Sequence, residues 1–295
     1  MNIMNILILE YKKFIRSKIF IVILSIIFIL LATLFYKNYL NYQQVDIDKK
    51  HELLMIKEEI SSILYPADKK SSCIYSKDKE KMNLLKNSLE ISEKTLKLKH
   101  SGDEKSFMES AILMYEKIIQ MHKNNIKFSI SKSYAQYEKE RLSEIIKSNA
   151  NFQYENAPLD GILIEYNNIK YILSTIFLLT IFYFFITTYL DFYHHKGFLF
   201  TLPINKNKFI NTKVLISLLI NLLLIFIQLI LIFFYCYVIK WKTTFNYPVY
   251  FNFYDIFLPA YKIILFYISM EFIFVFLIFL IFLLALKIYK KLKSN

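Results

Sequence analysis

Four long apolar runs constrain this chain more than any other feature of its sequence: Ile19–Tyr36, Tyr171–Leu190, Val214–Ile239 and Ile263–Leu286. Each run has about 18 or more residues with almost no charge, enough for a helix to cross a hydrocarbon layer of ~30 Å. The runs raise the apolar content of the 295 residues to 56%, above the share typical of soluble domains. The sequence therefore predicts an all-α, polytopic membrane protein with four transmembrane helices.

Basic residues beside these runs set the expected orientation. Three clusters precede the first run, separate the second from the third and follow the fourth, and the positive-inside rule places all three in the cytoplasm. We therefore expect a multi-pass protein of the plasma membrane with both termini cytoplasmic. The first run has a basic start like a signal peptide, but its length favours a retained anchor. The clusters are Lys12, Lys13, Arg16 and Lys18; Lys196, Lys206, Lys208 and Lys213; and Lys287, Lys290, Lys291 and Lys293.

The chain is thus expected to contain nine segments. Residues 1–17 form an interfacial amphipathic helix, on which Glu10, Lys12, Lys13 and Arg16 share the polar side; a cytoplasmic extension of the first span is the alternative. The other segments are transmembrane helix 1 (18–36), an extracellular helical domain (37–168), transmembrane helix 2 (169–190), a cytoplasmic coupling loop or helix (191–213), transmembrane helix 3 (214–239), an extracellular loop (240–262), transmembrane helix 4 (263–286) and a basic cytoplasmic tail (287–295).

The polar segment between the first two runs is nearly neutral. It carries 21 basic and 20 acidic residues between Lys37 and Asn168, so the net charge of +13 belongs mainly to the membrane borders and does not indicate nucleic-acid binding. Apolar residues recur in it with helical spacing. Ser101-Gly102-Asp103 is typical of one helix ending and the next beginning, and Tyr65-Pro66 of another break. We expect three to five helices arranged in hairpins.

The three glycines exclude a nucleotide-binding loop in this chain. Gly102, Gly161 and Gly197 lie far apart, whereas GxxxxGK[ST] and GxGxxG loops need clustered glycines that let backbone N–H groups approach phosphate. If the protein uses ATP, another chain must bind it.

The segment 191–213 between the second and third runs combines breaks, apolar residues and bases. Gly197 can end the second span, Leu202-Pro203 ends an apolar turn, and the following bases lead into the third span. These features predict a short helix, apolar on one side and basic on the other, that could dock into a soluble partner. An ordinary basic connecting loop is the alternative.

Two parts of the sequence resemble the permease subunits of ATP-binding-cassette exporters of the type-2 permease superfamily. The first is the helix Glu10-Tyr-Lys-Lys-Phe-Ile-Arg-Ser-Lys18 before the first span. The second lies between spans two and three, where the resemblance implies that the ATPase-coupling residues are Asp191, Gly197, Leu202, Pro203, Lys206, Lys208, Phe209 and Lys213. Members of the superfamily typically have six spans, whereas four are expected here, so the chain would be a reduced or divergent member.

The resemblance implies a permease that moves an amphipathic or peptide-like substrate outward, and antimicrobial-peptide export or immunity is one setting for that role. The chain itself would hold no cofactor; ATP and Mg²⁺ would bind to a partner P-loop ATPase, acting as a dimer. Its other partners would be a second permease copy or a different permease, and the lipid bilayer. The alternative is a non-transporting membrane scaffold or sensor whose helical ectodomain binds a partner.

One acidic and two amide residues lie within the apolar runs. Glu271 and Gln228 are at similar counts from the cytoplasmic ends of their runs, so we expect them to face each other, with Asn221 one helical repeat away. Such residues either line a substrate pathway or join helices by hydrogen bonds, and we favour the second interpretation.

The sequence offers no catalytic or metal site. His51-Glu52 begins like a zinc-protease motif, but Met55 occupies the position of the second histidine. His194 and His195 are adjacent, and neighbouring residues on a helix point ~100° apart, which is poor geometry for binding one ion. We therefore expect no enzyme activity and no bound metal in this chain.

Overall fold

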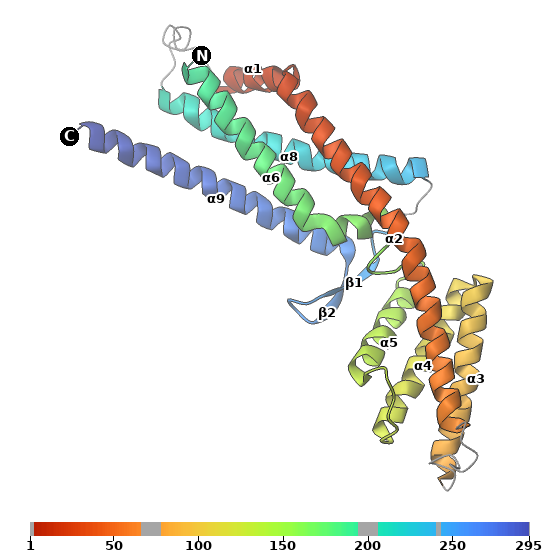
Figure 1. Cartoon of the computed structure of the whole chain (residues 1–295). Coiled ribbons are helices and arrows are strands. Elements are labelled where there is room, and N and C mark those ends of the chain that lie inside the picture. The colour runs from red at the N-terminus through yellow and green to blue at the C-terminus, as the bar shows by residue number, and fades with distance from the viewer. Residues whose placement is uncertain (1–2, 66–77, 194–205, 240–242, 295) are drawn as a thin grey trace. The chain divides into compact units, whose positions relative to one another are not determined.

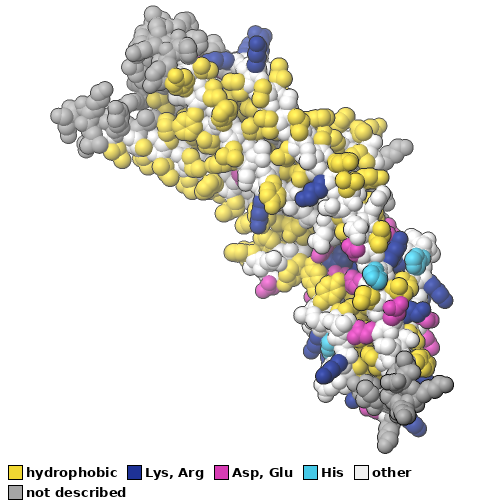
Figure 2. Space-filling view, in the orientation of Figure 1, with side chains coloured by type: hydrophobic (Ala, Val, Ile, Leu, Met, Phe, Trp, Pro, Cys, Tyr) yellow, Lys and Arg dark blue, Asp and Glu magenta, His cyan; other side chains and the backbone are white. Residues whose placement is uncertain are grey.

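The computed structural model describes residues 3–65, 78–193, 206–239 and 243–294. Within these residues, four helices are long and apolar enough to cross a membrane, which confirms the four predicted apolar helices. The chain divides into two compact units, which we name the membrane unit (Met1–Tyr36, Ile164–Thr243 and Lys262–Asn295) and the polar helical unit (Lys37–Leu163 and Thr244–Tyr261). Figure 2 shows hydrophobic side chains gathered over the first and charged side chains over the second.

The membrane unit contains all of α1 (Ile3–Ile15) and α8 (Lys206–Ile239) (Figure 1). It also contains the first part of α2 (Lys18–Leu64) and most of α6 (Gly161–Tyr193) and α9 (Ala260–Ser294). The Ser17 hydroxyl separates α1 from α2, because it accepts a hydrogen bond from the Phe20 N–H at 3.2 Å and caps the new helix. A buried apolar cluster joins α6, α8 and α9. It consists of Phe184, Val214, Leu218, Val275 and Phe279.

Helix α2 is longer than the sequence suggested. The predicted first span ends at residue 36, where polar residues begin, but the helix continues without interruption to Leu64. No glycine or proline occurs between these points, and a change from apolar to polar side chains does not interrupt backbone hydrogen bonding. The first half of α2 therefore belongs to the membrane unit and the second half to the polar helical unit.

The polar helical unit adds α3 (Lys79–Ser101), α4 (Glu104–Lys123) and α5 (Lys132–Lys147) to the second half of α2 (Figure 1). The predicted break between α3 and α4 is confirmed. Gly102 ends α3 in the left-handed conformation with φ of 78°, and the Asp103 carboxylate caps α4 by accepting from the Ser106 N–H at 3.2 Å.

Helix α4 forms the centre of this unit. One broad face of α4 is buried, and Phe107, Met114 and Ile118 lie on it. Against it, α3 presents a stripe of small polar residues, and the hydroxyls of Thr95 and Ser110 hydrogen-bond across the two helices at 2.7 Å. Because these side chains are small, α3 and α4 can approach each other closely.

The segment 240–262 was expected to be only an extracellular loop, but most of its described residues form a hairpin that belongs to the polar helical unit. Strands β1 (Pro248–Phe251) and β2 (Ile256–Pro259) pair antiparallel, with Pro248 opposite Pro259. The rings of Tyr137 on α5 and Tyr250 on β1 lie edge to face, with 5.7 Å between their centres. Aromatic residues on the two strands therefore attach the hairpin to the helices, a long-range contact that the local sequence did not indicate.

Candidate functional site

Four charged side chains meet where α1, the end of α6 and the start of α8 come together. The Lys213 ammonium lies 2.6 Å from a Glu10 carboxylate oxygen and also contacts Asp191, and the Lys13 ammonium lies 2.7 Å from the other Asp191 oxygen. We call these residues, Glu10, Lys13, Asp191 and Lys213, the charge network. It ties the N-terminal helix to two long apolar helices whose contributing residues lie about 180 to 200 positions away along the chain.

The charge network is buried at its centre. The side chains of Glu10, Asp191 and Lys213 are each no more than 6% exposed, while Lys13 remains 44% exposed. Two carboxylates face two ammonium groups, so the charges balance. Removing one partner from such a buried arrangement leaves an uncompensated charge, which typically costs about 3–5 kcal/mol.

Aromatic side chains surround the charge network. The Lys213 ammonium lies 5.4 Å from the centre of the Phe209 ring, one helical turn away on α8. Phe14, one turn after Glu10, is fully buried. Its ring packs edge to face against that of Tyr183 on α6, with 4.8 Å between the ring centres. These contacts fix the face that α1 turns toward α6 and α8.

The structure brings together residues from both parts of the sequence that carried the resemblance. Glu10 and Lys13 come from the first part, and Asp191, Phe209 and Lys213 from the second. Gly197, Leu202, Pro203, His194 and His195 lie outside the described residues. Lys206 and Lys208 belong to the first turn of α8, but their side chains are not among those described. Lys12 and Arg16 are exposed and do not join the charge network.

The intramembrane polar residues pair differently from the prediction. The Asn221 amide donates to Glu271 at 2.9 Å and to the Thr180 hydroxyl at 3.2 Å, whereas Gln228 donates to Glu165 at 2.5 Å. The predicted Glu271–Gln228 pairing is therefore wrong. Equal counts from the predicted span ends do not give equal depth, because α8 begins at Lys206 and α9 continues to Ser294.

Glu165 is a polar residue of the membrane unit that the sequence reasoning missed. Its segment was assigned to the extracellular domain, but α6 already begins at Gly161, and Glu165 is fully buried in it. The Asp160 carboxylate marks that start, since it accepts from the Ile162 N–H at 2.9 Å. An acidic residue directly before a glycine and a run of Ile and Leu was the available signal for an earlier helix start.

The contact between Asn221 and Glu271 leads to a test of its structural role. Glu271→Gln keeps an acceptor for the Asn221 amide and is expected to leave the thermal stability of the purified chain unchanged. Glu271→Leu removes the acceptor and is expected to cost roughly 0.6–2 kcal/mol of unfolding free energy in detergent micelles. Ser269→Ala is the matched control, because that hydroxyl donates to the Leu265 carbonyl of its own helix at 2.8 Å. Equal losses for Gln and Leu would contradict a hydrogen-bonding role.

The polar helical unit has its own charge cluster beside a pocket of about 350 Å³. The Arg141 guanidinium donates two hydrogen bonds of 3.1 Å to the Glu138 carboxylate and one of 3.2 Å to the Gln153 carbonyl. The Lys49 ammonium lies 3.5 Å from Glu138 and 2.9 Å from the Tyr115 hydroxyl. The buried bases at this pocket are thus already matched by acids of the same unit.

Electrostatics keep Glu138 ionised despite its burial. Burial alone would raise the pKa of the Glu138 carboxyl, but Arg141 and Lys49 outweigh that effect and hold its pKa below the ordinary value. The same neighbour, Glu138, overcomes the burial of Arg141 and raises the pKa of its guanidinium. Both groups stay charged at neutral pH and hold α5 to the segment that follows it.

Other observations add no further site. Among the residues that the structure describes, no group of three His, Cys, Asp or Glu side chains is placed to hold a metal ion. Comparisons of the chain with protein-family models, with curated proteins and with solved structures find no match.

Proposed function

We propose that the chain is the membrane-spanning permease subunit of an ATP-binding-cassette exporter, driven by a separate P-loop ATPase. The observation that carries this proposal is the charge network. Asp191 and Lys213 stand at the two ends of the segment 191–213, the proposed docking element, and their ion pair holds those ends together. A force applied to that segment by a soluble partner would act on α6, α8 and, through Glu10, on α1 as one body.

ATP and Mg²⁺ belong to the partner in this proposal, since widely spaced glycines give this chain no phosphate-binding loop. Both termini and the segment 191–213 face the cytoplasm of a cell whose plasma membrane the four helices cross. The transported substrate is an amphipathic or peptide-like molecule that leaves the cell, and a second permease copy or a different permease completes the pathway. Antimicrobial-peptide export or immunity is the setting that suits such a substrate.

Affinity purification of the full chain from its native membrane tests the proposal. We expect a P-loop ATPase to co-purify, and Lys206→Glu combined with Lys208→Glu to abolish its recovery, because the two bases precede the charge network on α8. Lys105→Glu combined with Lys127→Glu is the matched control, since it makes the same charge change at exposed sites of the polar helical unit. The control variant should retain the ATPase.

Two outcomes would overturn the proposal. One is a clean preparation without an ATPase from a cell that encodes one alongside the chain. The other is an ATPase that is lost equally from both pairs of variants, because then the charge of the chain and not the segment 191–213 would govern recovery. Recovery of a different soluble protein in place of an ATPase would favour the scaffold or sensor.

A further inference from the structure

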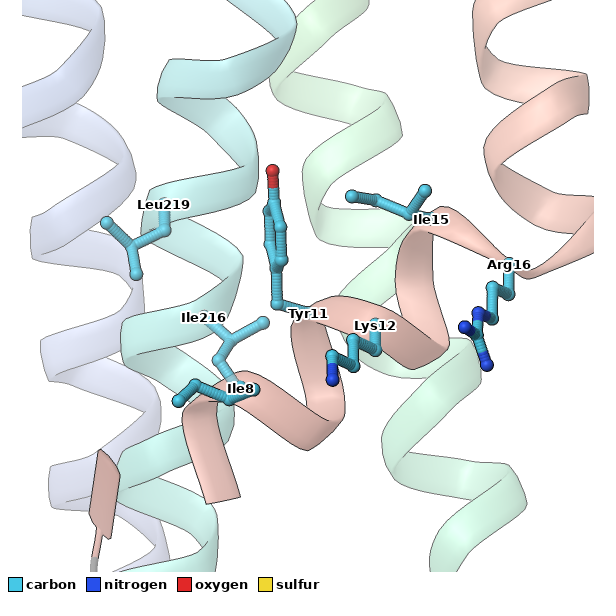
Figure 3. A pocket seen from close by; sticks show the side chains of 7 residues that line it. All are labelled: Ile8, Tyr11, Lys12, Ile15, Arg16, Ile216 and Leu219. Atoms are coloured by element: carbon cyan, nitrogen blue, oxygen red, sulfur yellow. The ribbon is translucent and has the colours of Figure 1, made fainter. Parts of the chain in front are cut away.

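A groove of about 390 Å³ runs between α1 and α8 in the membrane unit (Figure 3). Its walls are apolar: Ile8, Tyr11 and Ile15 from α1 face Ile216 and Leu219 from α8. Four of these five side chains are 41–49% exposed, although α1 is otherwise anchored by buried Glu10 and Phe14. The groove is therefore an apolar surface that the described part of the chain leaves open.

Two bases lie at the edge of the groove. Lys12 lies on α1 and Arg16 directly follows its end, where the Arg16 N–H donates to the Lys12 carbonyl at 3.1 Å, so the two bases lie one helical turn apart on the same side. In Figure 3 the two basic side chains extend in a different direction from Tyr11 and Ile15, the residues directly before them, while both bases still line the groove. Both side chains are exposed, and neither has an ion-pair partner among the described residues, in contrast to Lys13, which pairs with Asp191.

The apolar surface continues from the groove along α8. Leu215, Leu222 and Phe226 are exposed on this helix by 43–61%. A hydrocarbon chain lying in the groove would therefore meet further apolar side chains along the direction in which α8 crosses a membrane. The arrangement places bases at one end of an apolar track, which matches a molecule with an anionic head and a long hydrocarbon tail.

We propose that this groove binds one anionic phospholipid. The lipid phosphate lies between the Lys12 ammonium and the Arg16 guanidinium, and one acyl chain lies against Tyr11, Ile15 and Leu219. The two charges give the headgroup specificity, because each base near a membrane surface favours an anionic lipid over a zwitterionic one. The proposal does not depend on the transport role, since a scaffold with the same groove would bind the same lipid.

Native mass spectrometry of the detergent-purified full chain tests this site, with phosphatidylglycerol and phosphatidylcholine of identical acyl chains as probes. We expect one tightly bound phosphatidylglycerol per chain, with an affinity roughly thirty-fold higher than that of phosphatidylcholine at about 1 kcal/mol for each base. Lys12→Gln combined with Arg16→Gln should reduce binding to the phosphatidylcholine level. Leu219→Trp should abolish binding with both bases intact, because the larger side chain fills the groove.

Two matched controls keep the test specific. Leu277→Trp enlarges a side chain of similar exposure on α9, away from the groove, and Lys170→Gln combined with Lys262→Gln removes two exposed bases elsewhere in the membrane unit. Both controls should retain the lipid, and millimolar inorganic phosphate should not displace it. Equal binding of the two lipids, loss in the controls, retention in Leu219→Trp or displacement by phosphate would each overturn the proposal.

Discussion

Replacement of Lys213 by methionine is expected to lower the free energy of unfolding of the chain by about 3–5 kcal/mol, because it leaves two buried carboxylates with one half-exposed lysine. Methionine has a similar length and is apolar, so the loss reports the missing charge more than a cavity. The measurement is thermal or denaturant unfolding of the purified full chain in detergent micelles. Lys170→Met is the matched control, since Lys170 is exposed on α6 and has no described ion-pair partner; it should change stability by less than about 0.5 kcal/mol.

A second substitution in the same background identifies the cause. Glu10→Gln combined with Lys213→Met removes one charge of each sign and leaves the pair of Asp191 with Lys13 intact. This double variant should recover most of the stability lost in Lys213→Met. Asp191→Asn in the Lys213→Met background should recover less, because it leaves Glu10 buried and separated from Lys13. If neither addition restores stability, packing around Lys213 and not charge balance accounts for the loss.

Replacement of Arg141 by methionine has the largest expected effect on the polar helical unit. It removes three hydrogen bonds and leaves the buried Glu138 carboxylate with Lys49 at 3.5 Å as its remaining cationic partner. The expected loss is about 3 kcal/mol, at the lower end for a broken buried ion pair because Lys49 still compensates part of the charge. Hydrogen exchange of peptides from α4 and α5, measured on the full chain by mass spectrometry, should accelerate by roughly a hundred-fold.

Lys147→Met provides the control on the same helix. Lys147 pairs with Glu144 at 2.6 Å, but its side chain is 70% exposed, and such surface pairs contribute little. Exchange in α4 and α5 should therefore stay close to that of the unchanged chain. Equal acceleration in both variants would contradict a special role for the buried pair.

Lowering the pH tests the ion pair of Glu138 with Arg141 without a substitution. The pKa of Glu138 is lower in the folded chain than in the unfolded chain, so its contribution to stability is fully present above the unfolded pKa of about 4.3 and is lost as pH falls through the folded value. The protection of α4 and α5 from exchange, corrected for the intrinsic exchange rate at each pH, should therefore fall below about pH 4.5. Glu138→Gln should flatten that dependence.

Local sequence signals predicted much of the fold. The four apolar runs located the long helices, and Gly102 and Asp103 mark predicted helix ends that the structure confirms. Two features were not predicted. The length of α2 follows from the absence of helix breakers, which a change of polarity obscured, and the hairpin β1–β2 depends on aromatic contacts with distant α5.

The candidate site was predictable only in part. The resemblance selected Glu10, Asp191 and Lys213, but periodicity and spacing could not show that residues some 200 positions apart form one buried network. The Glu271 contact illustrates the same limit inside the membrane unit. Its partner depends on where α8 and α9 begin and end and how they cross, and residue counts along separate helices do not contain that information.

Site-specific photo-crosslinking in the native cell tests the central claim most directly, that the start of α8 meets a partner ATPase. The photoreactive residue p-benzoylphenylalanine replaces Lys208 in one variant and Lys105, an exposed residue of the polar helical unit, in the other. The account predicts a covalent adduct with a P-loop ATPase from position 208 and none from position 105. An ATPase adduct from position 105, or its absence from position 208 in a correctly inserted chain, would contradict it.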